Sequence, residues 1–212
     1  DDLAIKVATL ISDGNIVGWF QGRSEFGPRA LGNRSILADP RNPEMQKKLN
    51  LKIKYREGFR PFAPSVLEED YSKFFEGKIL SPYMLMVKKI QSKIKTEIPE
   101  DYLQLDYYDK LYTRRSKLQS ITHVDFSARI QTVSKKTNPK YWKLINEFKK
   151  LTNVGVLVNT SFNVRGEPIV NSPEDAFKCF MNTEMDILVI GNFIYFKKNQ
   201  KIKTTKTKFE SD

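Results

Sequence analysis

Residues 22–41 of the 212-residue chain read GRSEFGPRALGNRSILADPR. They follow a strand-like run, NIVGWFQ at residues 15–21, and they carry four arginines among three glycines. Glycines let the backbone approach a ligand closely, and each arginine offers a planar fork of donors that matches phosphate or carboxylate oxygens. Apolar residues such as Phe26 and Leu31 lie between the charges, which indicates a packed loop with directed arginines. The stretch therefore predicts a loop that binds a polyanion; a solvated basic loop whose glycines only make turns is the alternative.

The composition is that of a globular protein, with 40% hydrophobic and 12% aromatic residues. No apolar run approaches the roughly 18 residues of a membrane span, and the start shows no secretory pattern. We therefore expect a soluble, cytoplasmic chain without membrane contact. The first residue is not Met, which indicates a processed chain or a piece of a longer one. One cysteine excludes an internal disulfide, and with one histidine no zinc or other protein-bound metal site is expected.

The formal net charge is +11, and part of it lies at the C-terminal end. Six lysines occur between Lys197 and Lys208 among polar residues. We predict that residues 199–212 form a basic, disordered tail, with nucleic-acid contact as the weaker interpretation.

Periodicity and turn signals predict alternating strands and helices. Helices are expected over residues 3–11, 44–53, 68–75 and 139–151, and from residue 172, where serine and proline suit a first turn. Strands are expected over residues 16–20, 35–38, 65–67, 83–87, 128–133 and 154–158, with a closing hairpin over 187–190 and 193–196. This alternation predicts an α/β fold with a mixed sheet, in one domain over residues 1–198. Residues 88–119 follow no period, so we expect an insertion or a mobile lid there.

Four polar clusters are predicted to follow strands, at residues 23–34, 54–60, 123–129 and 159–163. In open α/β sheets ligands collect where strands end, so the clusters are expected to converge on one site. A nucleoside triphosphate would suit it, since arginine and lysine neutralise phosphates and stabilise charge during transfer. The chain has neither a Gly-x-x-x-x-Gly-Lys-Ser/Thr loop nor a dinucleotide fingerprint.

Other chemistry has less support from the residues. Ser161 with His123 would suit acyl transfer, but no nucleophile elbow surrounds the serine. A lone histidine is more often structural than a base. Asp125 and Glu25 could reach magnesium through a nucleotide, although carboxylates beside arginines usually form ion pairs.

Residues 22–41 resemble the signature of the C-terminal domain of NodU/CmcH-type O-carbamoyltransferases. The likeness continues, in the family's order, through RPFAP at 60–64, THVD at 122–125, ARIQTV at 128–133, NTSFN at 159–163 and GEPI at 166–169. Several blocks in register are more specific than any single motif. Residues 88–119 depart from the pattern, as an insertion would.

The resemblance implies a YrdC-like fold, a twisted mixed sheet flanked by helices. It also implies a reaction in which ATP and carbamoyl phosphate give carbamoyl adenylate, pyrophosphate and phosphate, with Mg²⁺ carried by the nucleotide. A separate N-terminal domain of the Kae1-like type, which holds its own metal and is not on this chain, would pass the carbamoyl group to an acceptor hydroxyl.

The resemblance also implies roles for single residues. Those expected around the phosphates and the carbamoyl group, as the catalytic set, are Arg29, Arg60, Arg129 and Ser161. Those expected to bind the nucleotide are Lys54, Arg129, Asn159, Thr160, Ser161 and Asn163.

The alternative is a basic RNA- or nucleotide-binding module without catalysis. In an RNA-binding module the arginines should spread over one open face, and nucleic-acid affinity should fall steeply with salt. In an enzyme they should line one pocket, and nucleic acid is then not an expected partner.

Overall fold

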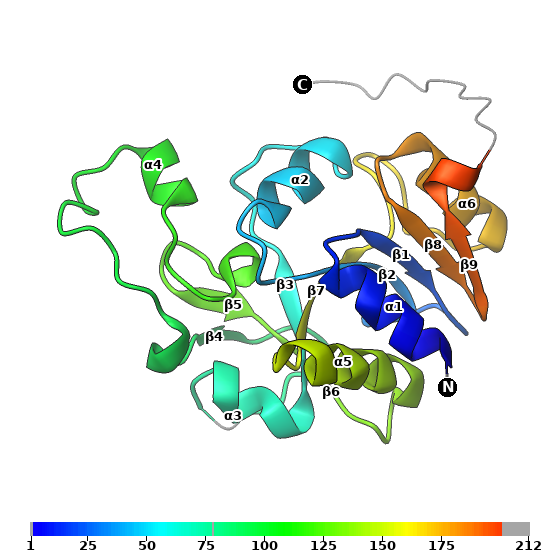
Figure 1. Cartoon of the computed structure of the whole chain (residues 1–212), viewed down its shortest axis with the longest axis horizontal. Helices are drawn as coiled ribbons and strands as arrows, with labels where there is room; N and C mark the ends of the chain where they lie inside the picture. The colour runs from blue at the N-terminus through cyan, green and yellow to red at the C-terminus, as the bar shows by residue number, and fades with distance from the viewer. Residues whose placement is uncertain (1, 78, 201–212) are drawn as a thin grey trace.

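The computed structural model describes residues 2–77 and 79–200, and its centre is a seven-stranded sheet in the order β6-β3-β7-β2-β1-β8-β9 (Figure 1). Its strands are β1 (Val17–Phe20), β2 (Arg34–Ala38), β3 (Ala63–Leu67), β6 (Gln131–Val133), β7 (Val156–Ser161), β8 (Ile187–Ile190) and β9 (Phe193–Phe196). Strand β1 runs parallel to β8 and β3 parallel to β6, whereas the other neighbours are antiparallel. The sheet is therefore mixed, as predicted.

Helices cover both faces of this sheet. Helices α1 (Asp2–Ser12) and α5 (Pro139–Thr152) lie side by side on the face turned to the viewer in Figure 1. Val7 and Phe148 belong there to one buried apolar cluster with Trp19 of the sheet. The second apolar cluster joins the sheet to the helices α2 (Met45–Lys52), α3 (Tyr71–Phe74) and α6 (Pro173–Asn182). The short 3₁₀ turn η1 (Glu68–Asp70) precedes α3. The result is a three-layer α/β arrangement with two cores.

Local sequence explains where the two long C-terminal helices begin. The Asn138 side chain accepts a hydrogen bond from the backbone N–H of Tyr141, and proline occupies the first turn of α5. Ser172 and Asp175 form a reciprocal capping box at the start of α6. Both starts agree with the predictions from the sequence.

Gly32 fixes how the loop between β1 and β2 returns to the sheet. Its φ of +112° lies in the region that favours glycine, and a Cβ there would come within 2.2 Å of the Tyr141 ring. The Gly32 carbonyl accepts a hydrogen bond of 2.9 Å from the Trp19 indole. The part of the loop from Ala30 onward therefore packs against α5 and the sheet. The expectation that Phe26 is packed as well is wrong, because this side chain is fully exposed.

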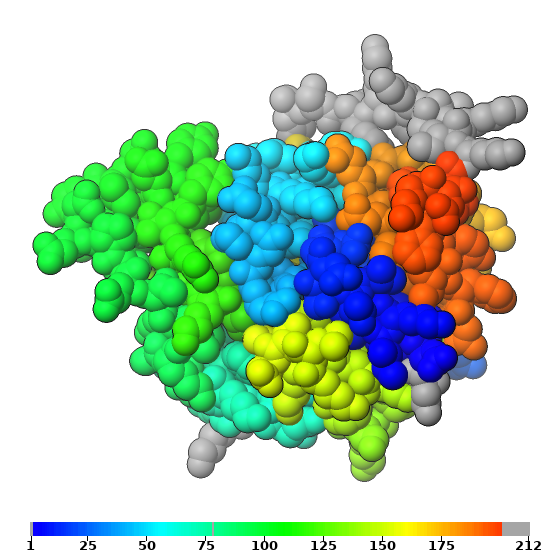
Figure 2. All heavy atoms as spheres, viewed as in Figure 1, coloured from blue at the N-terminus to red at the C-terminus, as the bar shows by residue number. Residues whose placement is uncertain are grey.

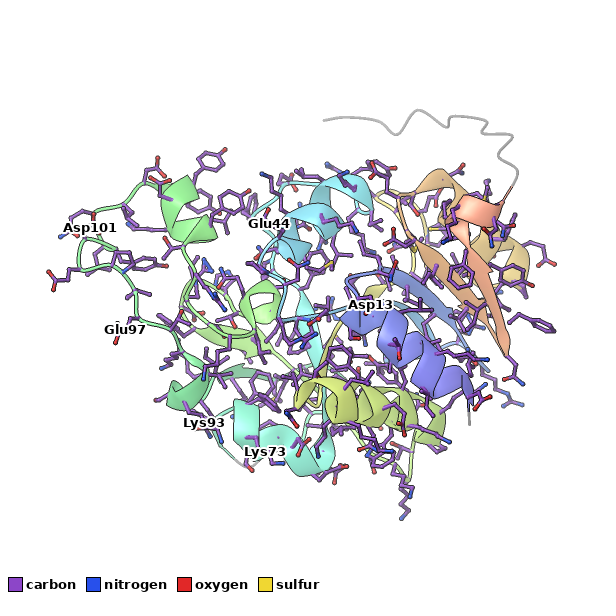
Figure 3. The ribbon with its side chains drawn as sticks, in the orientation of Figure 1. Asp13, Glu44, Lys73, Lys93, Glu97 and Asp101 are labelled. Carbon is purple, nitrogen blue, oxygen red and sulfur yellow. The ribbon has the colours of Figure 1, made fainter. Side chains whose placement is uncertain are left out.

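Strands β4 (Val87–Lys89) and β5 (Ser127–Arg129) form a separate pair, and the chain between them makes the expected excursion. It contains η2 (Ser92–Ile94), α4 (Tyr107–Tyr112) and η3 (Gln119–Ile121). Buried Arg115 donates to carbonyl oxygens of Lys110, Leu111 and Thr122, which ties α4 to η3. The excursion is the projecting green lobe of Figure 2, and Figure 3 shows Glu97 and Asp101 on its outer part.

Three predictions need correction or restriction. The strand predicted over residues 83–87 is wrong: the strand is Val87–Lys89, and Met84 has a left-handed φ of 57° that breaks the extended run. The strand predicted over 128–133 is two strands, β5 and β6, because the chain passes from one sheet to the other at Ile130. The first residue of the predicted tail, Asn199, ends the 3₁₀ turn η4 (Lys197–Asn199), and residues 201–212 lie outside the described residues.

In the described ranges, no helix combines the length and the apolar character needed to cross a membrane.

Candidate functional site

Two adjoining cavities lie at the end of the sheet where β7 finishes and β3 begins. The larger has a volume of about 540 Å³ and the smaller about 130 Å³. Their shared walls show that they are parts of one site, which we call the arginine pocket. The residues that line both are Arg29, Arg56, Pro61, Phe62, Ala63 and Arg129.

Most of the predicted site residues meet in this pocket. Arg29, Arg60 and Arg129 line the larger cavity. Arg29 and Arg129 also line the smaller cavity, together with the polar turn of Asn159, Thr160 and Ser161. Arginines that are a hundred residues apart in the sequence thus face one space.

Of the four arginines in residues 22–41, only Arg29 lines either described cavity. Arg34 is buried, and its guanidinium donates to the carbonyl oxygens of Gln21 and Gly22 at 2.9 and 3.0 Å. Arg41 forms an ion pair of 2.6 Å with Asp39. Arg34 thus holds the loop in place, and Arg41 pairs with a residue just after β2, roles that the count of charges alone did not reveal.

Glu25 also serves the loop. One of its carboxylate oxygens accepts hydrogen bonds from the backbone N–H groups of Leu31 and Asn33, at 2.6 and 2.8 Å. The carboxylate is occupied by the backbone that follows Arg29. Glu25 is therefore a brace of the loop and does not have the environment expected for a magnesium ligand.

Lys54 and Asn163 lie beneath the pocket and line neither cavity. The Lys54 ammonium group is 2.9 and 2.8 Å from the carbonyl and side-chain oxygens of Asn163, and it also donates to the Ser161 carbonyl. Burial, with a smaller effect of Arg56, lowers the pKa of Lys54 to about 7. The lysine is expected to contact a nucleotide, and in this structure its ammonium group binds the turn that follows β7.

Asn159 connects the polar turn to the arginine loop. Its side-chain nitrogen lies 3.1 Å from the Ala30 carbonyl oxygen, 3.0 Å from Ser65 Oγ and 2.9 Å from Gln131 Oε1. Gln131 in turn donates to the Leu31 carbonyl at 2.8 Å. This buried network fixes the backbone that follows Arg29 and ties it to the strand that leads to Ser161.

Positive charge predominates in the arginine pocket. Arg29, Arg56, Arg60 and Arg129 line it, against one lining carboxylate, Asp125. Nε of Arg129 is buried without a hydrogen-bond partner among the described residues, and Nη2 reaches only the Met84 sulfur at 4.0 Å. Burial, and then the charge of Arg29, lower the pKa of Arg129. A buried donor without a partner is costly, so an anionic ligand would stabilise this arrangement.

His123 and Asp125 lie on the wall of the larger cavity. Their closest atoms, Nδ1 and Oδ1, are 3.3 Å apart. Partial burial opposes ionisation of Asp125, but hydrogen bonds from Ser127 and Lys89 outweigh it and lower the pKa of the carboxyl to about 2. Its oxygens are thus already engaged, and the described residues contain no group of three or more metal-binding side chains.

Sequence reasoning missed two features of the site. Arg56 belongs to the cluster at residues 54–60 that was expected to converge on the site, but it was not itself named as a site residue, and the wall formed by Pro61, Phe62 and Ala63 was not predicted. The cluster at residues 54–60 was expected to follow a strand, but it lies between α2 and β3 and so precedes a strand. It joins the site because β3 runs antiparallel to β7, so the start of one strand lies at the end of the other.

The chain matches a family model and several known proteins along most of its length. A family model described as "Carbamoyltransferase C-terminus" matches residues 8–197. Nodulation protein NolO of Bradyrhizobium diazoefficiens is 48% identical over 93% of this chain and 33% of its own length. The 3'-hydroxymethylcephem-O-carbamoyltransferase of Amycolatopsis lactamdurans is 36% identical over 90% of this chain and 32% of its own length. The chain thus spans about a third of the length of these relatives.

A crystal structure of full-length HypF, described as phosphate- and nucleotide-bound, has a similar fold. Its TM-score is 0.52 at 16% identity, over 90% of this chain and 21% of that one. The likeness confirms the predicted YrdC-like α/β fold.

Proposed function

Because this chain belongs to the carbamoyltransferase C-terminus family, we propose that its arginine pocket binds ATP and carbamoyl phosphate and forms carbamoyl adenylate. The observation that carries the proposal is Arg129, a partly buried guanidinium whose Nε lacks an acceptor among the described residues and which shares its cavity with three other arginines. Phosphate and carbamate oxygens would supply the missing acceptors. That HypF was crystallised with phosphate and nucleotide is consistent with such ligands in this fold.

The two cavities suit two ligands of different size. The larger, with Arg60 and the His123–Asp125 pair, would hold the nucleotide. The smaller, with Thr160 and Ser161, would hold the carbamoyl group. Arg29 and Arg129 line both cavities, so they would lie where the two ligands meet.

The reaction needs position and charge stabilisation more than a protein nucleophile. Water cleaves carbamoyl phosphate to carbamate and phosphate. A carbamate oxygen then bonds to the α-phosphorus of ATP, and the bond to the bridging oxygen breaks to release pyrophosphate. Guanidinium groups at the junction would bring two anions together and stabilise the charge that moves to the leaving group.

Magnesium would arrive with the nucleotide. The phosphates of the nucleotide would provide most of the ligands of the metal ion. The oxygens of Asp125 are engaged by Ser127 and Lys89, and the carboxylate of Glu25 is engaged by the backbone. The metal would screen the pyrophosphate charge, while the arginines orient the reacting groups.

The final transfer would use another part of the polypeptide. The relatives are about three times as long as this chain, and one of them is named as an O-carbamoyltransferase. We propose that the N-terminal Kae1-like domain takes the carbamoyl group from the adenylate and passes it to an acceptor hydroxyl.

An isotope-exchange assay tests the first half-reaction. The 212-residue chain is incubated with ATP, Mg²⁺ and labelled pyrophosphate, with and without carbamoyl phosphate, and label in ATP is measured. We expect exchange that requires carbamoyl phosphate, together with saturable ATP binding. Absence of both exchange and ATP binding would overturn the proposal. ATP binding without exchange would favour a nucleotide-binding module without catalysis, and tight RNA binding that falls steeply with salt would favour a nucleic-acid module.

A further inference from the structure

We propose that the projecting lobe, residues 93–117, is a surface through which two copies of this chain associate about a twofold axis. In this arrangement the acidic outer end of each lobe meets the basic root of the other lobe. The inference is independent of the proposed function, because no residue of the lobe lines either described cavity of the arginine pocket.

The outer end of the lobe is acidic. Residues 96–109 contain five carboxylates and no lysine or arginine, although the whole chain has a net charge of +11. All five side chains are exposed, and none forms an ion pair with another described residue. The five residues are Glu97, Glu100, Asp101, Asp106 and Asp109. The lobe therefore presents unpaired negative charge on a basic protein.

The root of the lobe, where it joins the body of the protein, is basic. Lys93, Arg114 and Lys117 are exposed there, and none of them pairs with a carboxylate among the described residues. Figure 3 shows Lys93 near the body, and Glu97 and Asp101 further out along the lobe. The charge of the lobe thus changes sign from its root to its outer end.

Backbone hydrogen bonds hold the root in one conformation. The N–H group of Thr96 donates to the carbonyl oxygen of Arg115 at 3.1 Å, and that of Lys117 donates to the carbonyl oxygen of Ile94 at 2.9 Å. The side chain of Arg115 is buried inside the lobe. The segment that leaves the body and the segment that returns are therefore tied side by side, which keeps Lys117 at the same end of the lobe as Lys93.

Exposed apolar side chains accompany the acidic residues. Leu103 is 79% exposed and Tyr108 is 68% exposed, and Ile98 and Tyr107 are exposed as well. The Tyr107 ring packs edge-on against the rings of Tyr108 and Phe59, at centroid distances of 5.8 and 6.2 Å. Burial of such side chains against a partner is favourable, and tyrosine is enriched at protein interfaces. The lobe thus combines an apolar contact surface with opposite charges at its two ends.

A surface with this charge pattern fits a second copy of itself. A twofold interface uses the same patch on both subunits, so that the patch must be self-complementary. Two lobes that lie antiparallel meet this condition, since the acidic end of each then faces the basic root of the other. A standard interface involves roughly 20–30 residues on each side, which is the size of the lobe.

Sedimentation equilibrium of the 212-residue chain tests the proposal. At low salt we expect a concentration-dependent equilibrium between the 24.7-kDa chain and a species of twice that mass. Added salt should weaken the dimer, because it screens pairs of exposed charges. A single 24.7-kDa species at low salt and the highest soluble concentration would overturn the proposal, and would leave the lobe as a solvated insertion or a contact for a different polypeptide.

Charge reversal identifies the surface that holds the dimer together. An outer-end variant carries Glu97→Lys and Asp101→Lys, and a root variant carries Arg114→Glu and Lys117→Glu. We expect each variant alone to dimerise roughly tenfold or more weakly than the wild type, because like charges then face each other. A mixture of the two variants should associate again, since both contacts of the mixed dimer join opposite charges. A general loss of stability would not be repaired by mixing.

Leu103→Ser should also weaken the dimer, because it removes an apolar contact without changing any charge. The matched controls are Asp13→Lys and Lys6→Glu, since both residues are exposed and lie on or just after α1, outside the lobe. These controls should dimerise like the wild type, and circular dichroism should be the same for all variants. A dimer that either charge reversal leaves unchanged would overturn the proposal, because a different surface would then join the two copies.

Discussion

Ala63 and Asn159 are paired across the antiparallel strands β3 and β7. The pairing places the start of β3 beside the end of β7. The basic segment before Ala63 therefore meets the polar turn after Asn159, although nearly a hundred residues separate them. The arginine pocket depends on this register, and four predictions test the site and the framework that holds it.

Arg60→Lys should reduce carbamoyl phosphate-dependent pyrophosphate exchange by roughly tenfold or more. The substitution keeps the charge, but an ammonium group cannot make the two parallel hydrogen bonds of a guanidinium. Initial exchange rates at saturating ATP measure the effect, and Arg114→Lys serves as the control. Exchange like that of the wild type would reduce Arg60 to a general electrostatic role.

Arg129→Ala should abolish the same exchange and leave the fold intact. The arginine is partly buried, and its Nε has no partner among the described residues, so its removal takes away no internal hydrogen bond of that group. Exchange assays and thermal unfolding should be run in parallel. Arg23→Ala is the control, because Arg23 is an exposed arginine of the loop between β1 and β2 and lines neither cavity. Retained exchange in the Arg129 variant would remove this residue from the site.

Gly155→Ala should destabilise the protein by about 1–3 kcal/mol through overpacking. A Cβ at this position would lie 2.4 Å from Asp70 Oδ2, and that carboxylate is held by two lysines. Gly58→Ala is the comparison, since its Cβ would meet the movable end of Tyr112 at 3.0 Å. Urea unfolding of both variants measures the difference. Equal stability of the two variants would contradict the close contact with Asp70.

Asp70 should contribute stability that depends on pH. Its side chain is 2% exposed and lies 2.7 Å from both Lys73 and Lys149. Burial alone would raise the pKa of Asp70, but the two lysines outweigh it and the net pKa is lowered. The unfolded chain then binds this proton more readily than the folded one. The contribution is therefore complete above the unfolded pKa of about 3.9 and is lost as pH falls through the folded value.

Asp70→Asn measures this contribution. Urea unfolding at pH 7 should show a loss of roughly 1.5–3 kcal/mol relative to the wild type, and the loss should shrink at pH 3 and below. A difference between the two proteins that stays the same at both pH values would show that the ionised carboxylate is not its source.

Local sequence patterns were reliable where a single segment determines its own conformation. Ser172 and Pro173 predicted the start of α6, and Gly191 with Asn192 predicted the turn between β8 and β9. The run after Tyr83 misled because its apolar residues look extended, whereas Met84 is left-handed and the strand begins at Val87. The apolar composition of a segment does not show that one of its residues, here Met84, has a positive φ angle.

Charged residues show the same limit at the site. Arg29 and Arg34 are only five residues apart, yet Arg29 lines the pocket and Arg34, at the start of β2, binds backbone carbonyls within the fold. Lys54 and Arg56 are two residues apart, and only Arg56 lines the described cavities. The residue type is the same or similar in each pair, so it could not distinguish a ligand contact from a brace.

The sequence by itself determined the alternation of strands and helices, the α/β class, and the polar segments from which a site would be built. Those features depend on caps, turns and hydrophobic periods that act over a few residues. The tertiary structure alone decided which side chains face the pocket, because that depends on strand register between segments a hundred residues apart. It also decided which cations find acceptors inside the fold, since burial and hydrogen-bond partners are set by neighbours that are distant in the chain.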